Sequence, residues 1–161
     1  MIEFNITELQ KQEALTLYKF KVLNNSIEKG AGNFAGALGE ILFKDYYKNK
    51  DANLLHSQDY NYDFIFNNKK IEIKTARVNN LPKMHHHVNL SDHNSRQKCD
   101  FYFFIYVTND YNKGWFVGYE SKKKYFEIAD FWLRGDKGDC NFVYQSDTYS
   151  TRLINLKQVN E

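Results

Sequence analysis

Cysteine and proline are scarce in this chain, and the few that occur are isolated. Pro82 is the single proline, and Cys99 and Cys140 are the two cysteines among 161 residues. Two cysteines so far apart form neither a zinc-ligand motif nor the framework of a disulfide-stabilised domain. We therefore expect both to be free, buried thiols.

Long apolar runs are also absent. No stretch approaches the length of a transmembrane helix, and the first ten residues, MIEFNITELQ, lack a basic region followed by an apolar run. We expect a cytoplasmic protein, or one that acts in the cytoplasm of a host cell, with no membrane partner. The composition, 42% hydrophobic and 17% aromatic, is typical of a globular chain. The length predicts a single domain over residues 1–161.

Net charge is only +2, but the basic residues are unevenly distributed. Between residues 69 and 98 there are seven basic residues against two acidic ones, whereas the flanking segments are slightly acidic. Local basic patches of this kind bind phosphate groups, although a solvated basic face would have the same composition. The candidate nucleic-acid contacts are Lys70, Arg77, Lys83, His86, Arg96 and Lys98.

Residues 63–74, DFIFNNKKIEIK, predict a β-hairpin. Apolar residues alternate on both sides of Asn67-Asn68, a pair that tolerates the left-handed backbone of a tight turn. A two-residue loop would place Asp63 opposite Glu72, with Lys74 two residues further along the same face. The opposite, apolar face would consist of Phe64, Phe66, Ile71 and Ile73.

The two acids and the lysine on this face of the hairpin indicate a catalytic, metal-binding function. Two carboxylates placed opposite each other need a shared proton or a cation between them. Magnesium takes oxygen ligands of this kind, and an adjacent lysine can stabilise charge on a phosphate. Metal-assisted hydrolysis of a phosphodiester would use such a set. Two alternatives stay open: a solvated ladder of surface salt bridges, and a three-residue loop with a different register.

The remaining pattern predicts alternating helices and strands. The predicted helices cover residues 7–23, with Thr7 as N-cap, 31–48 and 122–133. The predicted strands cover residues 53–57, 61–67, 69–77, 85–90, 101–108 and 115–119, with edge strands at 141–145 and 151–156. Glycines at positions 32, 36 and 39 cost helix stability, so we expect close packing of the second helix against a neighbour. Glu40 lies one turn after Gly36 and projects past that small-residue face.

The order of these elements resembles the PD-(D/E)XK nuclease superfamily, whose motif is an acid on one strand and (D/E)-x-K on the next. Here the helix with Glu40 precedes Asp63, which precedes Glu72-Ile73-Lys74. GALGEILFKDYY is similar to the glycine-flanked glutamate helix of many members. KCDFYFFIYV and GWFVGYESKKKYFEIADFWLRGDK look like the segment after the motif in small nucleases of phages and mobile elements. The resemblance covers residues 30–157.

The resemblance implies an α/β (α+β) fold with a restriction-endonuclease-like core, a central mixed β-sheet flanked by α-helices over residues 30–157. Residues 1–29 would form an N-terminal helical extension. The implied activity is DNA endonuclease chemistry with Mg²⁺ or Mn²⁺ and a metal-activated water.

Asp63 and Glu72 would be the metal ligands, and Lys74 would position and activate the attacking water. Glu40 would be an additional acid that contacts the metal directly or through water. Tyr62 occupies the position at which the family pattern has proline. This difference does not change the expected reaction. No convincing Gln-x-x-x-Tyr pattern of the exonuclease branch follows the motif, which favours an endonuclease.

Three further interpretations stay open. A Holliday-junction or branched-DNA resolvase of the same fold would act as a homodimer, because two strands must be cut symmetrically. A non-catalytic nucleic-acid-binding module would keep the fold without the reaction. A structural or interaction protein would carry the motif by chance. DNA, duplex or branched, is the expected partner under the first two interpretations.

Overall fold

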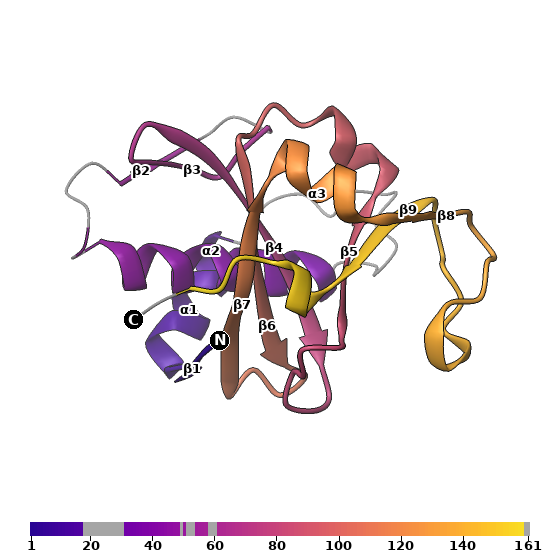
Figure 1. Cartoon of the computed structure of the whole chain (residues 1–161). Coiled ribbons are helices and arrows are strands. Elements are labelled where there is room, and N and C mark those ends of the chain that lie inside the picture. Colours follow the sequence, from indigo (N-terminus) through magenta and orange to yellow (C-terminus); the bar gives the residue numbers. More distant parts are fainter. Residues whose placement is uncertain (18–30, 49, 51–53, 58–60, 160–161) are drawn as a thin grey trace.

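The computed structural model describes residues 1–17, 31–48, 50, 54–57 and 61–159, and these form a mixed α+β fold (Figure 1). The helices are α1 (Glu8–Leu17), α2 (Ala31–Tyr47) and α3 (Lys122–Ile128), with 3₁₀ turns η1 (Asp92–Arg96), η2 (Asp139–Asn141) and η3 (Leu153–Asn155). The strands are β1 (Ile2–Asn5), β2 (Leu55–His56), β3 (Phe64–Phe66), β4 (Lys69–Val78), β5 (His87–Ser91), β6 (Phe101–Thr108), β7 (Lys113–Ser121), β8 (Asp130–Trp132) and β9 (Thr148–Arg152). Among the described residues, no helix combines the length and apolar character needed to span a membrane.

The larger sheet has six strands in the order β1-β7-β6-β4-β3-β2. β4 and β6 run parallel, and the other neighbouring strands pair antiparallel, so the sheet is mixed, as the resemblance implied. β6 lies between β4 and β7 and is buried on both faces, as its uninterrupted apolar run indicated. A smaller sheet has the order β5-β9-β8.

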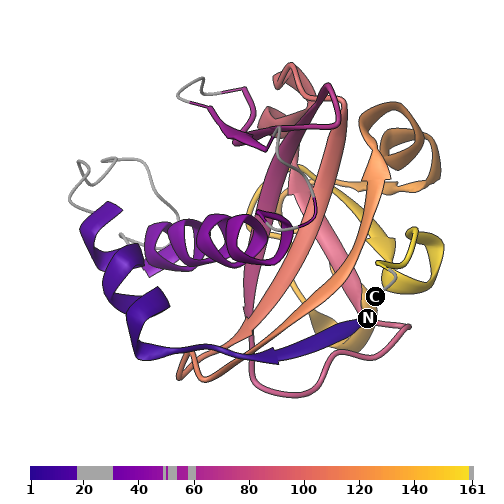
Figure 2. The same ribbon diagram turned by 90° about the vertical axis from the view of Figure 1, so that its left-hand side faces the viewer.

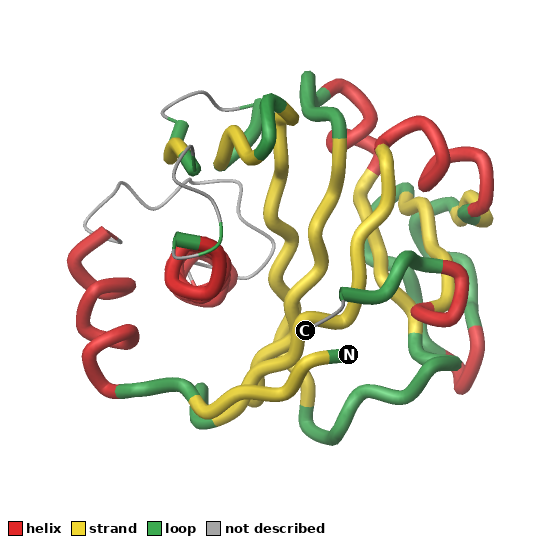
Figure 3. The backbone as a smooth tube through the Cα atoms, turned by 60° about the vertical axis from the view of Figure 1, so that its left-hand side comes forward, coloured by secondary structure: helices red, strands yellow, loops and turns green. Residues whose placement is uncertain are grey.

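The two faces of the six-stranded sheet have different coverings. Helices α1 and α2 lie on one face, whereas α3 and the smaller sheet lie on the other (Figures 2 and 3). Alternate residues of β4 therefore point into different surroundings. Ile71 and Ile73 belong to the core under α2. Glu72 and Lys74 lie on the opposite face, where they are paired in register with Tyr102 and Phe104 of β6.

The predicted hairpin and its turn are confirmed. Asn67 and Asn68 have φ angles of 48° and 59°, as a two-residue turn of this hand requires. Phe64 pairs with Ile71 in the expected register. The ladder ends at Phe64, however, so the expected pairing of Asp63 with Glu72 is not formed. The backbone N–H of Asp63 instead donates to the carbonyl of Ile71 at 2.9 Å.

Helix α2 confirms the second predicted helix, and one of its glycines has a packing role. A Cβ at Gly39 would lie 1.9 Å from Oγ1 of Thr75 on β4, so only glycine permits this approach. A Cβ at Gly36 would meet nothing within 4 Å, so close packing does not account for that residue. Helix α1 begins as predicted, with the Thr7 hydroxyl accepting the N–H of Gln10 at 3.3 Å. Residues 18–23 of the first predicted helix lie outside the described residues.

Several predicted boundaries are wrong. The segment expected to be a helical extension begins with β1, which pairs with β7. The helix predicted over residues 122–133 ends at Ile128, because the following residues pair with β9 as β8. Residues 141–145 form no regular strand, and the strand predicted at 151–156 is β9 followed by η3. Cys99 is a buried free thiol, as expected.

Candidate active site

The predicted motif residues come from three parts of the fold. Glu40 lies on α2, Asp63 immediately precedes β3, and Glu72 and Lys74 lie on β4. The Lys74 Nζ atom is 2.8 Å from Oε1 of Glu72. The Asp63 Oδ2 atom accepts the backbone N–H of Ile73 at 2.7 Å. Because Ile73 separates Glu72 from Lys74, the Asp63 carboxylate lies against the part of β4 that carries both side chains.

The local sequence accounts for most of this arrangement. Residues two apart on a strand share a face, which brings Lys74 beside Glu72. Their side chains are 24% and 9% exposed, so they do not form the solvated salt-bridge ladder considered as an alternative. Asp63 leaves the β3–β4 ladder at its last pair, which lets its carboxylate turn toward β4.

Electrostatics link the three carboxylates. Burial raises the pKa of Asp63 to about 8, and repulsion from Glu72 and then Glu40 adds to this effect. The Ile73 N–H and Lys74 act in the opposite direction. Burial also raises the pKa of Glu40, and Glu72 adds to it, although a hydrogen bond from His56 opposes the rise. Glu40, Asp63 and Glu72 therefore share one electrostatic neighbourhood.

Three contacts of the site were missed by sequence reasoning. The Gln97 Nε2 atom donates to Oε1 of Glu72 at 2.6 Å, and Lys122 Nζ donates to the Gln97 carbonyl. His56 Nε2 lies 3.0 Å from Oε2 of Glu40. Gln97 reaches Glu72 because β6 runs parallel to β4, so the loop before β6 lies beside the first half of β4. No motif in the sequence signals these contacts, since each depends on which strands are neighbours.

Some of the candidate nucleic-acid contacts lie near these carboxylates. Lys70 is two residues before Glu72 and on the same face of β4. Arg96 and Lys98 flank Gln97, the partner of Glu72. Lys70, Arg96 and Lys98 are all exposed. Half of the predicted basic set therefore lies within two residues of Glu72 or of its partner Gln97.

The other candidates lie toward the far end of β4. Arg77 is five residues beyond Glu72, roughly 16 Å along the strand, and by alternation belongs to the opposite face. Lys83 and His86 lie between β4 and β5, where Nδ1 of His86 accepts the N–H of Lys83 at 3.2 Å. Burial lowers the pKa of His86, and the neighbouring His85 and Lys83 lower it further.

The carboxylates have the chemistry of a site for a hard cation, but they do not converge. Among the described residues, no group of three or more His, Cys, Asp or Glu side chains is arranged to hold a metal ion. Within the described part of the chain, Oδ2 of Asp63 accepts from Ile73, and Oε1 of Glu72 accepts from Lys74 and Gln97. Oxygen donors on buried, mutually repelling acids fit Mg²⁺ or Mn²⁺.

Comparison with known proteins does not assign this site. No protein-family model matches the chain, and neither a curated protein nor a solved structure matches it. A functional assignment therefore depends on the geometry and chemistry of the residues themselves.

Proposed function

We propose that this chain is a metal-dependent DNA endonuclease with a restriction-endonuclease-like core of the PD-(D/E)XK superfamily. The observation that carries the proposal is that Asp63, just before β3, accepts the backbone N–H of Ile73 on β4, between Glu72 and Lys74, which are themselves paired at 2.8 Å and mostly buried. A buried pair of acids is costly, and hydrolysis of phosphodiesters is a reaction that uses such a pair. The exposed Lys70, Arg96 and Lys98 supply the positive surface that DNA needs.

Each residue has a role that follows from its position. Asp63 and Glu72, with Glu40 as the third acid, would hold Mg²⁺ or Mn²⁺. When bound, such an ion polarises the phosphate and lowers the pKa of water. Lys74 stabilises negative charge on the phosphate and orients the attacking water. Gln97 holds the Glu72 carboxylate in place through its 2.6 Å hydrogen bond.

One observation favours a second candidate, a DNA-binding module without catalysis. Oε1 of Glu72 already accepts from both Lys74 and Gln97, so its charge is compensated without an added cation. A protein that only binds DNA would keep this arrangement unchanged when the partner arrives. Cleavage separates the two candidates.

The test is cleavage of supercoiled plasmid and of a four-way DNA junction in Mg²⁺, Mn²⁺ or EDTA. We expect DNA cleavage that requires the metal ion. The cleavage rate of Lys74→Ala should be at least about 100-fold lower than that of wild type, which is the effect of losing one preorganised charge-stabilising group. The matched control is Lys113→Ala, because Lys113 Nζ is also 2.8 Å from a glutamate, Glu3, but lies where β7 pairs with β1. The control is expected to cut at the wild-type rate.

The outcomes are distinct. Equal cutting by Lys74→Ala and wild type would contradict the proposed site. Salt-sensitive DNA binding without cutting would support the binding module instead. Preference for the four-way junction over plasmid would identify a branched-DNA resolvase within the same class.

A further inference from the structure

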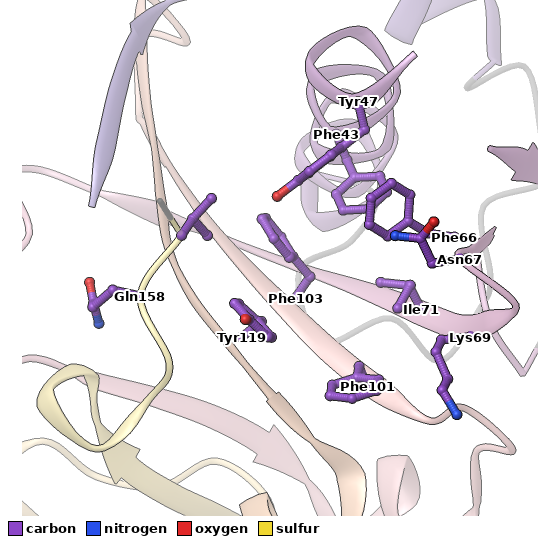
Figure 4. A pocket seen from close by; sticks show the side chains of 11 residues that line it. Phe43, Tyr47, Phe66, Asn67, Lys69, Ile71, Phe101, Phe103, Tyr119 and Gln158 are labelled. Carbon is purple, nitrogen blue, oxygen red and sulfur yellow. The ribbon is translucent and has the colours of Figure 1, made fainter. Parts of the chain in front are cut away.

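An aromatic cavity lies on the face of the six-stranded sheet opposite Glu72 and Lys74. It has a volume of about 370 Å³, within the range of about 300–1,000 Å³ typical of small-molecule sites. Phe43 and Tyr47 of α2 form one wall, and Phe103 and Tyr119 of the sheet form another (Figure 4). The cavity thus lies where the C-terminal end of α2 meets the sheet.

The walls of the cavity are suited to a planar ring. Tyr119 and Phe103 are cross-strand neighbours on the sheet wall, and their rings are almost parallel, with an interplanar angle of 9° and centroids 6.3 Å apart. Phe101 and Phe66 are only half-buried, so part of their surface faces the open space. Aromatic side chains with free faces stack favourably on nucleobases of any sequence.

The C-terminal segment closes one side of the cavity. Gly118 has a φ of 148°, and a Cβ there would lie 2.9 Å from the Lys157 carbonyl, so glycine allows this segment to approach β7. Tyr119 and Lys157 then exchange backbone hydrogen bonds of 3.0 Å. Gln158 and Val159 consequently line the cavity beside Tyr119.

A cation stands at the rim. Lys69 lines the cavity mouth with its ammonium directed outward, next to the Asn67-Asn68 turn (Figure 4). The adjacent Lys70 points to the other face of β4, toward the side of Glu72 and Lys74. The tip of the hairpin therefore presents one lysine to the cavity and the next to the carboxylate cluster.

We propose that this cavity binds the base of an unpaired nucleotide, while Lys69 and Lys70 contact consecutive phosphates that cross the hairpin tip. An aromatic cavity beside a cation can bind a planar base and the phosphate attached to it. The second lysine can bind the next phosphate of the same strand. The inference rests on the proposed function in taking DNA as the partner. It adds that DNA with unpaired bases is the preferred form.

The experiment uses a short single-stranded oligodeoxynucleotide with one 2-aminopurine, whose fluorescence is quenched by stacking, in EDTA. We expect saturable quenching by wild type and roughly tenfold weaker binding by Tyr119→Leu, which keeps the apolar volume but removes the stacking face. Lys69→Gln is expected to weaken binding as well. The matched controls are Tyr149→Leu, whose ring packs on Phe126 and Phe131 of the other face, and Lys137→Gln, an exposed lysine elsewhere.

The outcomes separate this inference from the nuclease proposal. Quenching that Tyr119→Leu leaves unchanged would overturn the cavity assignment. A free mononucleotide that competes as well as the oligonucleotide would assign the cavity to a small cofactor and would also overturn it. Quenching without plasmid cleavage would remove the nuclease proposal alone, and cleavage without quenching would remove the cavity inference alone.

Discussion

At Asp63, burial and two neighbouring carboxylates all act against ionisation, which raises its pKa to about 8. An aspartate in the unfolded chain titrates near pH 3.9. Between these values the unfolded state releases a proton that the folded state keeps, so the contribution of Asp63 to stability is most favourable below about pH 4 and falls as pH rises toward 8. The candidate site is therefore a place where metal-free protein loses stability at neutral pH.

Replacement of Asp63 tests this sign. Asp63→Asn keeps an oxygen that can accept the Ile73 N–H but removes the titrating group. We expect wild type in EDTA to lose free energy of unfolding from pH 5 to 8, by less than about 1.4 kcal/mol per pH unit. The slope should be smaller in Asp63→Asn. Chemical denaturation at several pH values measures it.

Asp130→Asn, at an exposed position of β8, is the control and should retain the wild-type slope. An unchanged slope in Asp63→Asn would show that burial and the neighbouring carboxylates do not raise the pKa of Asp63.

At the scale of elements, contact between α2 and β4 determines where Glu40 lies. Gly39 precedes Glu40 directly and is in close contact with Thr75. Among the described residues, the buried Thr75 hydroxyl has no hydrogen-bond partner. Thr75 therefore contributes here through its packing against α2 and not through a hydrogen bond. The helix can approach the strand only because residue 39 has no side chain.

Two glycine replacements in α2 should change stability in opposite directions. Gly39→Ala is expected to lower the free energy of unfolding by about 1–3 kcal/mol through overpacking against Thr75. Gly36→Ala has open space and should raise it by about 0.5–1 kcal/mol through helix propensity. Urea denaturation of both variants measures the difference. Thr75→Ala should partly restore Gly39→Ala, and equal stabilities of the two alanine variants would contradict the close contact.

At the scale of the whole molecule, the two faces of the central sheet divide the basic residues. Arg96 and Lys98 flank the Gln97 that contacts Glu72, whereas Arg77 lies on the other face near the end of β4. A duplex bound at the carboxylates would contact the first two. The positive charge of Arg77 would lie away from this bound duplex.

The salt dependence of DNA binding tests this division. Each lost phosphate contact reduces the slope of log K against log salt by about 0.9, so Arg96→Ala with Lys98→Ala should reduce it by about 2. Arg77→Ala should leave the slope near its wild-type value. Titrations in EDTA at several salt concentrations give these slopes. An equal reduction by Arg77→Ala would place the bound DNA on a different surface.

The sequence by itself determined the features that depend on local spacing. The Asn67-Asn68 turn sets the register of β3 and β4, the helical period places α2, and a continuous apolar run identifies β6 as a buried strand. The pairing of Glu72 with Lys74 on one face follows from strand alternation alone. These features need only neighbours a few residues apart, whose turn chemistry and periodicity are visible in the chain.

Only the tertiary structure decided what surrounds that pair. The parallel pairing of β4 with β6 brings Gln97 to Glu72, and the end of the ladder at Phe64 turns Asp63 toward Ile73. The packing of α2 and the C-terminal segment on the sheet forms the aromatic cavity. These three features depend on the order of the strands in the sheet and on where the elements packed on it end. Local patterns do not encode that order, because it is set by the burial of both sheet faces at once.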